Sequence, residues 1–563
     1  MSTDHNADQR FDNIVTVLIA SVAIWVAITA YFQNYASNLS DQARRRAQQF
    51  AIEATKREVN GVLQYSYEWQ GAFQTWYELS LQITAAEQNG DTAAVARYEA
   101  LQEQILPLSK LLGPQYFDAS SFNFPDLSKF EADSYLVEST RLSETYLAES
   151  ELGNEMDDTS ESLIVQITLL TVSLSLYGLS LALKGRVRWL FVAVGSSIVG
   201  FCAIWLSWSL IELIGRSEVN QNAINAYSEG VGLSYQGRYE EAIEKFDIAL
   251  QENTYYAKAY YERGNAYYSL GDLNTAIADM EDARFWGLDE DVSVNWNLGW
   301  TYYLNGQYPK AIEVNEVVLS KRPEVIGVRS NQAISYLVMG DFANAQAQYD
   351  LLLQEAQFQV NEARQRNAEP SASLWLYMDY GAQDLQSLID TLESNQKPWT
   401  QAPQKDLIAG DHAAIREFAL EQMKRIKEAI VALEYTGQLP APNSATQIDS
   451  FRVGSITGRN EENLISGFEP ARNAVIPYGE DTFDIEFTYS GAVPEQVIWK
   501  VYINGREDQS LRKVLNQDIS AGDTWYQTFG YGYTNVFILA SGEYVVELYA
   551  DNKFLSSITF SVR

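Results

Sequence analysis

Three long apolar runs dominate the hydrophobic pattern of the chain. Residues 14–32, 163–183 and 189–211 contain no charged side chain. Each run is long enough for a helix that crosses a bilayer, so we predict transmembrane helices at 14–32, 163–183 and 189–214. A cleaved signal peptide is the alternative for the first run, but its apolar region would be only about 7–15 residues long. A buried helical hairpin in a soluble protein does not account for three such runs.

Basic residues between the second and third runs predict the orientation. Three of the five residues in the turn at 184–188 are basic, and positive charges next to membrane helices favour the cytoplasmic side. We therefore expect a cell-membrane protein with residues 1–13 and the 184–188 turn in the cytoplasm. Residues 33–162 and everything after residue 214 would lie outside. Three arginines at 44–46 count weakly against this orientation.

Polar sequence with helical periodicity fills residues 33–162, which are predicted to form an extracytoplasmic helical domain. The expected helices run from Leu39 to about Glu87, from about Thr92 to Leu112, and from Leu127 toward the membrane. The Asn89-Gly90-Asp91 turn separates the first from the second. A looser aromatic segment with Phe117, Phe122 and Phe124 separates the second from the third.

The most regular pattern lies between about Asn222 and Leu353. Gly237, Gly271, Gly306 and Gly340 are 34, 35 and 34 residues apart. Each has a small residue seven positions before it, a bulky residue four before it and an alanine five after it. Small residues let two helices approach closely, and a glycine permits a tight turn. Such pairs bury their apolar faces only by stacking on one another.

This pattern resembles the tetratricopeptide repeat family, whose units are helix–turn–helix pairs of about 34 residues. The resemblance implies four repeats over residues 219–356 that form an α-solenoid with a concave groove. The chain departs from the family at Asn315, where an aromatic residue is usual, and at Ala333, and a proline closes only the third repeat, at Pro323. Members of the family bind other proteins and rarely catalyse reactions, so the resemblance implies protein partners and no enzyme activity.

Superposing the repeats places six residues on the inner face of the first helix of two pairs: Tyr261, Asn265, Tyr268, Trp296, Trp300 and Tyr303. Aromatic side chains carry much of the energy of interfaces, so we predict a groove that binds a peptide or a helix. Packing against a neighbouring repeat is the alternative. Family members that grip a C-terminal carboxylate carry lysine and arginine in this groove. Only Lys258 and Asn265 match part of that arrangement, so carboxylate clamping is not expected.

Helical periodicity continues beyond the repeats. Amphipathic helices are expected at 371–393 and from about His412 to Tyr435, within a helical capping region at 357–438. Such helices would cover the open end of the stack. Pro398 and Pro403 mark a loop between them, and the stretch at 440–444 is predicted to be a linker.

Residues 445–563 change to a two-residue period, which predicts an antiparallel β-sandwich. Alternating segments and hairpin turns recur at Asp484–Tyr489, Val497–Ile503, Asn504-Gly505, Tyr544–Tyr549 and Asp551-Asn552. The architecture resembles an immunoglobulin-like domain without its cysteine pair. The turn Phe529-Gly530-Tyr531-Gly532-Tyr533, near Trp525, is interpreted as covering one end of the sandwich, with stacking on a sugar or docking on a partner as the alternative.

Composition narrows the possible functions. The 563-residue chain has a formal net charge of −34, which argues against nucleic acid or an anionic membrane surface as a partner. One cysteine and two histidines leave no basis for a disulfide, a histidine-based active site or a metal cluster. Asp157 and Asp158 lack the spacing of a calcium loop and are interpreted as part of a solvated acidic face. No phosphate-binding loop or nucleophile motif is present, and no cofactor is predicted.

The sequence predicts a multidomain protein of mixed class, with three transmembrane helices, a helical insert, an α-solenoid and a C-terminal β-sandwich. We expect a non-catalytic scaffold that holds protein partners at the outer face of a prokaryotic membrane. Two alternatives stay open. One is an accessory subunit of a membrane complex or cell-surface assembly, and the other is an extracytoplasmic ligand sensor. The short cytoplasmic segments leave little room for an output domain.

Overall fold

A computed structural model describes residues 2–118, 124–215, 219–393, 402–440, 446–459, 465–516, 524–531 and 538–563. The chain divides into two compact units, Met1–Leu288 (unit 1) and Asp289–Arg563 (unit 2), and each unit is described by itself. Several residues named above lie outside the described ranges: Phe122, Pro398, residues 441–444 of the predicted linker, Gly532 and Tyr533.

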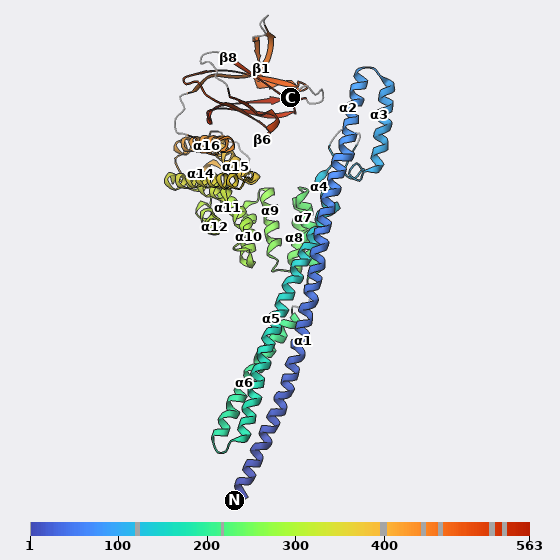
Figure 1. Cartoon of the computed structure of the whole chain (residues 1–563), viewed down its shortest axis with the longest axis vertical. Helices are drawn as coiled ribbons and strands as arrows, with labels where there is room; N and C mark the ends of the chain where they lie inside the picture. Colours follow the sequence, from blue (N-terminus) through green and yellow to red (C-terminus); the bar gives the residue numbers. More distant parts are fainter. Residues whose placement is uncertain are drawn as a thin grey trace. The chain divides into compact units, whose positions relative to one another are not determined.

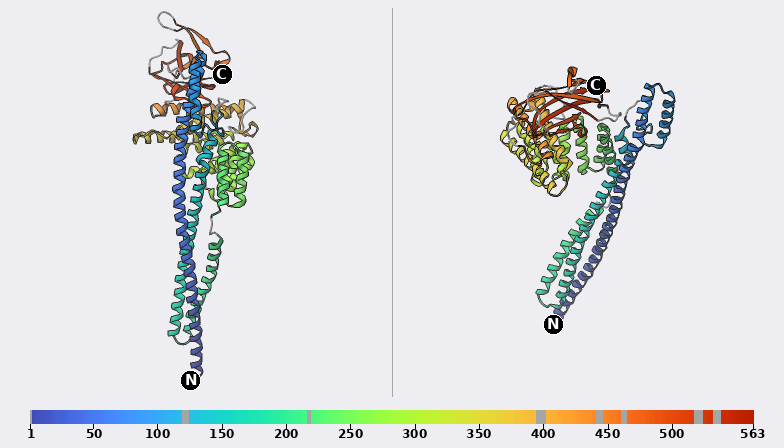
Figure 2. Two further views of the ribbon diagram at one scale, coloured as in Figure 1. Left: turned by 90° about the vertical axis from the view of Figure 1, so that its right-hand side faces the viewer. Right: turned by 45° about the horizontal axis from the view of Figure 1, so that its top comes forward.

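Two long helices form the frame of unit 1. The first is α1 (Ser2–Ser66), which continues through the π-helical η1 (Tyr67–Phe73) into α2 (Gln74–Gln88). The returning helix consists of α4 (Leu127–Glu131), the π-helical η3 (Ala132–Leu136) and α5 (Val137–Ala182). Figures 1 and 2 show α1 and α5 side by side over much of their length. Small residues make this close packing possible, because Ala36 and Ala43 are fully buried against Leu152 and Met156.

Three helical segments of unit 1 are long and apolar enough to cross a membrane: Asp8–Gln88, Leu127–Ala182 and Val187–Ile211. The predicted uncharged runs lie within them. Where the sequence suggested a new helix at Leu39, however, α1 passes through without a break. No glycine or proline lies between residues 32 and 39, so nothing in the local sequence interrupts the backbone hydrogen bonds.

The helical hairpin at the far end of α1 differs from the prediction at one terminus. Its second helix, α3 (Thr92–Ile105), begins as expected, with the Asp91 side chain accepting a hydrogen bond from the Ala94 amide at 3.0 Å. It stops at Ile105 and passes into the 3₁₀ turn η2 (Leu106–Leu108), so the expected end at Leu112 is wrong. Pro107 is the physical reason, because it lacks the N–H group that a continuing helix needs.

The third candidate span, α6 (Val187–Gly215), packs against α5. Polar groups cross this contact, since the Tyr177 and Ser196 hydroxyls lie 2.9 Å apart and the Gln166 amide donates to Ser209 Oγ at 3.3 Å. At the N-terminal end, Arg188 pairs with Asp8 at 2.8 Å. These contacts join the three apolar helices into one bundle.

Unit 1 ends with two helix pairs. They are α7 (Gln221–Tyr235) with α8 (Tyr239–Glu252), and α9 (Ala257–Leu270) with α10 (Leu273–Ala283), followed by the π-helical η4 (Arg284–Leu288). The turns inside the pairs contain Gly237 and Gly271 at φ +73° and +88°, which confirms the predicted role of these glycines. A Cβ atom on Gly230 would lie 2.5 Å from the Phe246 ring, so the small residue does permit close approach of α7 and α8.

The first helix pair is fixed to α5. A Cβ atom on Gly232 of α7 would overlap Val137 Cγ2 of α5. Glu144 of α5 binds the second pair, because its carboxylate accepts from Lys258 Nζ at 2.7 Å and from the Tyr256 hydroxyl at 3.0 Å. The stalk formed by α1 and α5 and the first two helix pairs therefore share one packed unit.

Unit 2 opens with three further helix pairs. Their helices are α11 (Val292–Leu304), α12 (Tyr308–Lys321), α13 (Ile326–Val338), α14 (Phe342–Gln365), α15 (Ala372–Glu393) and α16 (His412–Tyr435), with the 3₁₀ turn η5 (Lys405–Leu407) before α16. The last two confirm the predicted amphipathic helices. Gly306 and Gly340 occupy the turns inside the first two pairs at φ +73° and +80°.

The C-terminal part of unit 2 is a β-sandwich. Its strands are β1 (Gln447–Arg459), β2 (Ile465–Pro470), β3 (Val475–Ile476), β4 (Thr482–Ser490), β5 (Val497–Ile503), β6 (Arg506–Glu507), β7 (Lys513–Leu515), β8 (Thr524–Gly530), β9 (Gly542–Ala550) and β10 (Lys553–Val562), with short 3₁₀ turns at η6 (Arg472–Ala474) and η7 (Gln509–Leu511). One sheet has the order β2-β1-β4-β8 and the other β3-β10-β9-β5-β6, with β7 also paired to β5.

The two sheets share one apolar core that includes Phe483, Ile485, Trp499 and Val546. Strand pairs are antiparallel apart from β3 with β10. The predicted turn at Asn504-Gly505 joins β5 to β6. The turn at Asp551-Asn552 joins β9 to β10, and both of its residues have positive φ, as tight hairpin turns require. The immunoglobulin-like resemblance stays a prediction.

Strand β5 departs from simple alternation because both of its faces are buried. Trp499 and Val501 point into the sandwich core. Ile498 packs instead against Val431 of α16 and Tyr549 of β9. A strand that is covered on both faces no longer shows one polar side. The β-sandwich is therefore packed directly on the last helix of unit 2.

We expect Gly232→Ala to destabilise the protein by roughly 1–3 kcal/mol, because the added methyl group overlaps Val137 in a packed contact. Elsewhere in a helix the same change stabilises by about 0.5–1 kcal/mol. Thermal unfolding of the full chain in mild detergent would measure the difference. Gly178→Ala is the control, because a Cβ atom there meets no atom within 4 Å.

The double variant Gly232→Ala, Val137→Ala tests the cause of that loss. It removes the methyl group that the new Cβ would strike, so it should unfold at a higher temperature than Gly232→Ala alone. Equal stability of the two variants would mean that the α5–α7 contact is not the source of the effect.

Candidate protein-binding site in the helical repeats

The predicted groove residues of unit 1 lie on α9 and are partly buried. These are Tyr261, Asn265 and Tyr268. The Asn265 amide donates a long hydrogen bond of 3.5 Å to the Glu262 carboxylate. Burial raises the pKa of Glu262, and that amide acts in the opposite direction by favouring the charged carboxylate. The helix thus presents aromatic rings next to an acidic group.

The lysine on α9 that could bind a partner's C-terminal carboxylate already has an ion-pair partner within the chain. Lys258, which would hold a partner's carboxylate, is already paired with Glu144 of α5 at 2.7 Å. The Glu144 carboxylate also accepts from the Tyr256 hydroxyl. The stalk therefore supplies to Lys258 the negative charge that a C-terminal carboxylate would offer, and the absence of carboxylate clamping stays a prediction.

Of the predicted binding residues in unit 2, Trp296 of α11 is the best placed to contact a partner. Its ring lies over Gly327 of α13, where a side chain would collide with it. Through this gap the ring reaches Tyr377 of α15, at a centroid distance of 4.9 Å. Trp296 Nε1 lies 3.0 Å from the Asn331 side-chain amide, close enough for the amide oxygen to accept its hydrogen.

The other two predicted binding residues on α11 mainly pack against neighbouring side chains. Tyr303 is fully buried, so it cannot touch a partner directly in this structure. Trp300 is partly buried, and its ring lies 4.8 Å from that of Tyr303 at an interplanar angle of 30°. Both residues lie on α11, the first helix of its pair, as the repeat pattern predicted. The pattern did not reveal how deeply each side chain is buried.

A cavity of about 650 Å³ opens beside Trp296. Trp296 and Tyr377 line it together with Phe358 of α14, whose side chain is 60% exposed. Phe358 and Tyr377 are not among the predicted groove residues, because both lie beyond the regular repeats. The only signal for them was an aromatic residue on each of two amphipathic helices.

Acidic side chains outnumber basic ones around this cavity. The acids are Glu324, Glu355, Glu362 and Glu369, and the bases are Arg322 and Arg366. Arg366 pairs with Glu362 at 2.5 Å, and Arg322 pairs with Glu324. Gln359 donates to Glu355 at 2.9 Å. The cavity thus combines an aromatic wall with an excess of negative charge, which suits an apolar or cationic side chain.

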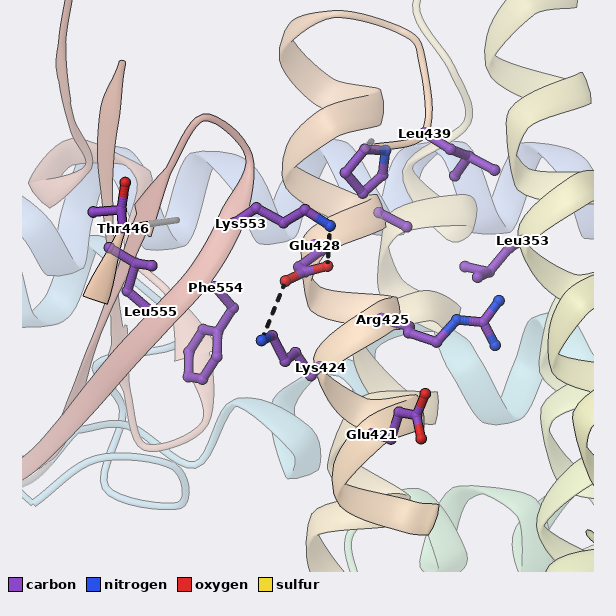
Figure 3. A pocket seen from close by; sticks show the side chains of 12 residues that line it. Leu353, Glu421, Lys424, Arg425, Glu428, Leu439, Thr446, Lys553, Phe554 and Leu555 are labelled. Carbon is purple, nitrogen blue, oxygen red and sulfur yellow. Dashed lines mark hydrogen bonds and ion pairs between the residues drawn. The ribbon is translucent and has the colours of Figure 1, made fainter. Parts of the chain in front are cut away.

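A second cavity of about 520 Å³ lies between α16 and β10 (Figure 3). Its central group is Glu428, which is 5% exposed. The carboxylate lies between two lysines, 3.1 Å from Lys553 Nζ and 3.9 Å from Lys424 Nζ. Phe554 is the one aromatic residue among those that line it. Glu428 already pairs with Lys553, and only one aromatic side chain lines this cavity, so it is the weaker candidate for capturing a peptide.

The same face of the β-sandwich carries a buried ionic network. Lys500 of β5 is 1% exposed and contacts Glu434 of α16 at 2.8 Å and Glu507 of β6 at 3.4 Å. Burial alone would lower the pKa of Lys500, but these two carboxylates outweigh it and raise the pKa. Arg512 contacts both carboxylates as well.

Two carboxyl groups on α15 lie in surroundings that disfavour their charged form. Burial raises the pKa of Asp379 to about 6, with Lys500 opposing the shift and nearby carboxylates adding to it. Burial also raises the pKa of Asp384 to about 7. Among the described residues no charged partner offsets Asp384. Both groups bind protons more tightly in the folded chain than in the unfolded chain.

Other residues singled out in the sequence have structural roles. Asp157 pairs with Arg44 at 2.6 Å, which ties α5 to α1. Phe529 is part of the sandwich core, and the Tyr531 hydroxyl donates to Asp508 at 2.7 Å. These two aromatic residues cover the sandwich rather than project from it.

Comparison with known proteins supports the repeat assignment. Residues 227–291 match a tetratricopeptide repeat model. Two crystal structures of MamA are 23% and 22% identical, with TM-scores of 0.24, and cover 25% and 27% of this chain and 81% and 80% of their own. Pseudomonas fluorescens alkylpurine DNA glycosylase AlkC, bound to DNA containing an abasic site analog, is 15% identical, with a TM-score of 0.18, over 63% of this chain and 91% of its own. Scores this low carry no conclusion about fold or function. No curated protein matched the chain.

We predict that Asp379→Asn stabilises the folded protein at pH 7.5 by roughly 1–2 kcal/mol, because it removes a negative charge from a poorly solvated position. The folded-state pKa is raised from 3.8 to about 6. Its contribution therefore favours folding below about pH 4 and declines as the pH rises toward 6. Unfolding midpoints between pH 4 and 8 would show a flatter profile in the variant.

Asp384→Asn is the matched comparison. Its raised pKa of about 7 extends the decline in stability to a higher pH, so this variant should flatten the profile up to about pH 7. Profiles identical to the wild type in both variants would contradict the assigned protonation behaviour.

Proposed function

We propose that the protein is a non-catalytic, membrane-anchored scaffold that binds protein partners through its helical repeats. The observation that carries this proposal is the cavity beside Trp296, where aromatic rings and acidic side chains meet on a repeat helix. The match of residues 227–291 to a tetratricopeptide model adds support, because modules of this kind mediate protein interactions. The three apolar helices would supply the anchor.

The proposed binding surface has a primary and a secondary part. In the primary part, Trp296, Tyr377 and Phe358 receive an apolar or cationic side chain of a peptide or helix. Trp300 and the fully buried Tyr303 support Trp296 from the same helix. In the secondary part, Tyr261, Asn265 and Tyr268 of α9 form a separate contact area. Neither part needs a metal ion or cofactor.

We place the N-terminus and the 184–188 turn in the cytoplasm, and the repeats and β-sandwich outside. This orientation rests on the basic turn, because positive charges next to membrane helices favour the cytoplasmic side. In the structure Arg188 of this turn pairs with Asp8, so the two segments assigned to the cytoplasm lie together. The immunoglobulin-like domain and the prokaryotic source belong to the same proposal.

Ligand sensing is the second candidate function, and one observation favours it. The α1 helix runs unbroken from Ser2 to Ser66, and α1 and α5 each extend from a candidate span into the polar region. A pair of continuous helices is stiff, so a change at the distal hairpin could move the membrane segments. The role of accessory subunit in a membrane complex also fits the anchor and the repeats.

Replacement of Phe358 by alanine should weaken partner binding by about tenfold or more, since its exposed ring would become buried against the partner at the centre of the proposed contact. Because this side chain is 60% exposed, the substitution removes little internal packing and the variant should fold. Quantitative pull-down from native membranes would compare wild type, Phe358→Ala and Trp296→Ala. Tyr478→Ala, at a 59% exposed residue of the sandwich, is the control. If folded Trp296→Ala and Phe358→Ala retained every partner, the groove would not be the binding site.

Thiol labelling would test the orientation. In a Cys202→Ala background, a membrane-impermeant thiol reagent applied to intact cells should modify Asn89→Cys in the turn after α2. It should modify Arg186→Cys in the basic turn only after the membrane is permeabilised. The reverse labelling pattern would show that the orientation is opposite to the one proposed. Labelling of both positions in intact cells would contradict the proposed membrane anchor.

A further inference from the structure

Three aromatic side chains, two exposed and one partly buried, form a cluster at one edge of the helix pairs of unit 1. Tyr255 lies in the loop between α8 and α9 and is 69% exposed, and Phe285 in η4 is 76% exposed. Trp286 joins them, with its ring 4.8 Å from that of Tyr255 and 4.8 Å from that of Phe285. We call these three residues the aromatic edge. Contiguous exposed aromatic surface is unusual and marks interaction sites.

The packing of unit 1 determines which way this edge faces. The start of α7 contacts α5 at Thr145, where Gln221 Nε2 lies 3.4 Å from Thr145 Oγ1. The Asn220 side chain donates to Glu252 O at the end of α8, and Tyr256 reaches Glu144. The loops that carry the aromatic edge are therefore level with residues 144 and 145 of α5. The turns inside the pairs lie at the opposite edge, because α7 runs antiparallel to α5 and ends near Glu131.

Distance along α5 separates the aromatic edge from the bilayer. The uncharged run begins at Leu163, and a helix rises about 1.5 Å per residue, so roughly 27 Å of helix lie between Thr145 and that point. Aromatic residues that anchor proteins to lipid sit at the headgroups, within about 5–8 Å of the hydrocarbon. The aromatic edge faces the membrane but lies too far from it to touch lipid.

The helix surface below the edge is acidic. Glu144, Glu151 and Asp158 are seven residues apart, so they form one stripe along α5. Glu144 binds the repeats, while Glu151 and Asp158 are exposed and have no ion-pair partner in the described part of the chain. The C-terminal ends of α8 and α10 lie at the aromatic edge and add partial negative charge.

We infer that the space between the aromatic edge and the bilayer is a docking site for the extracytoplasmic part of a second, membrane-embedded protein with a basic surface. The inference rests on the proposed membrane anchor and adds a binding surface distinct from the cavity at Trp296. The aromatic edge would cover an apolar patch of the partner, and the Glu151–Asp158 stripe would attract its lysine and arginine side chains. A partner rooted in the same bilayer reaches this space at high effective concentration.

Site-specific photocrosslinking in native membranes tests this inference. The full chain would carry p-benzoylphenylalanine in place of Phe285, and a second version would carry it in place of Tyr67, which is 71% exposed in the π-helical η1. We expect an adduct from position 285 and none of the same mass from position 67. The captured protein should stay in the membrane after an alkaline carbonate wash. A carbonate-soluble partner, a second copy of this chain, or no adduct would overturn the inference.

Charge reversal provides the specific test. Glu151→Lys with Asp158→Lys should lower the adduct yield by about fivefold or more, because the stripe would then repel a basic surface. Gln48→Lys with Gln49→Lys on α1 is the matched control for added positive charge. An unchanged yield after reversal of the stripe would overturn the inference. Repeating the experiment with Phe358→Ala separates the two proposals, since loss of the groove partner should leave the adduct at position 285 intact.

Discussion

A stack of helix pairs has two ends, and each end exposes an apolar face that no further pair covers. In unit 1, α5 covers the first pair, and the absence of a side chain at Gly232 lets Val137 approach the α7 backbone. In unit 2, the β-sandwich covers the last helix through Ile498 and Tyr549, which pack on Val431. Both covering surfaces belong to the same chain, so neither of these two faces needs a separate polar capping repeat.

The same covering contacts position the surfaces that are proposed to bind partners. Because α5 continues from its contact with the repeats into an apolar run, the length of one helix would set the height of the first pairs above a bilayer if that run spans the membrane as proposed. Glu144 of that helix forms an ion pair with Lys258, one of the two residues that match part of a carboxylate-clamp arrangement. In unit 2, Gly327 leaves space for Trp296 to reach Tyr377, and this contact forms the aromatic wall of the cavity.

Features governed by local backbone chemistry could be predicted from the sequence. Gly237 and Gly271 adopt positive φ because a turn between two helices requires it, and Asn504-Gly505 forms a hairpin turn for a similar reason. The predicted end of α3 at Leu112 is wrong because Pro107 lacks the N–H group that a longer helix would need. Tyr303 lies on α11 but is fully buried, and periodicity cannot say whether a later helix covers a given helix face.

By itself, the sequence determined the three apolar runs, the spacing of the helix pairs and the change from helix to strand near residue 445, because all of these depend on periodicity and turn residues. The tertiary structure alone decided the pairing of Lys258 with Glu144, the burial of both faces of β5 and the cavity shared by Trp296, Tyr377 and Phe358. Each of these contacts joins residues that are distant in sequence. Their positions follow from how whole elements pack, which no local pattern encodes.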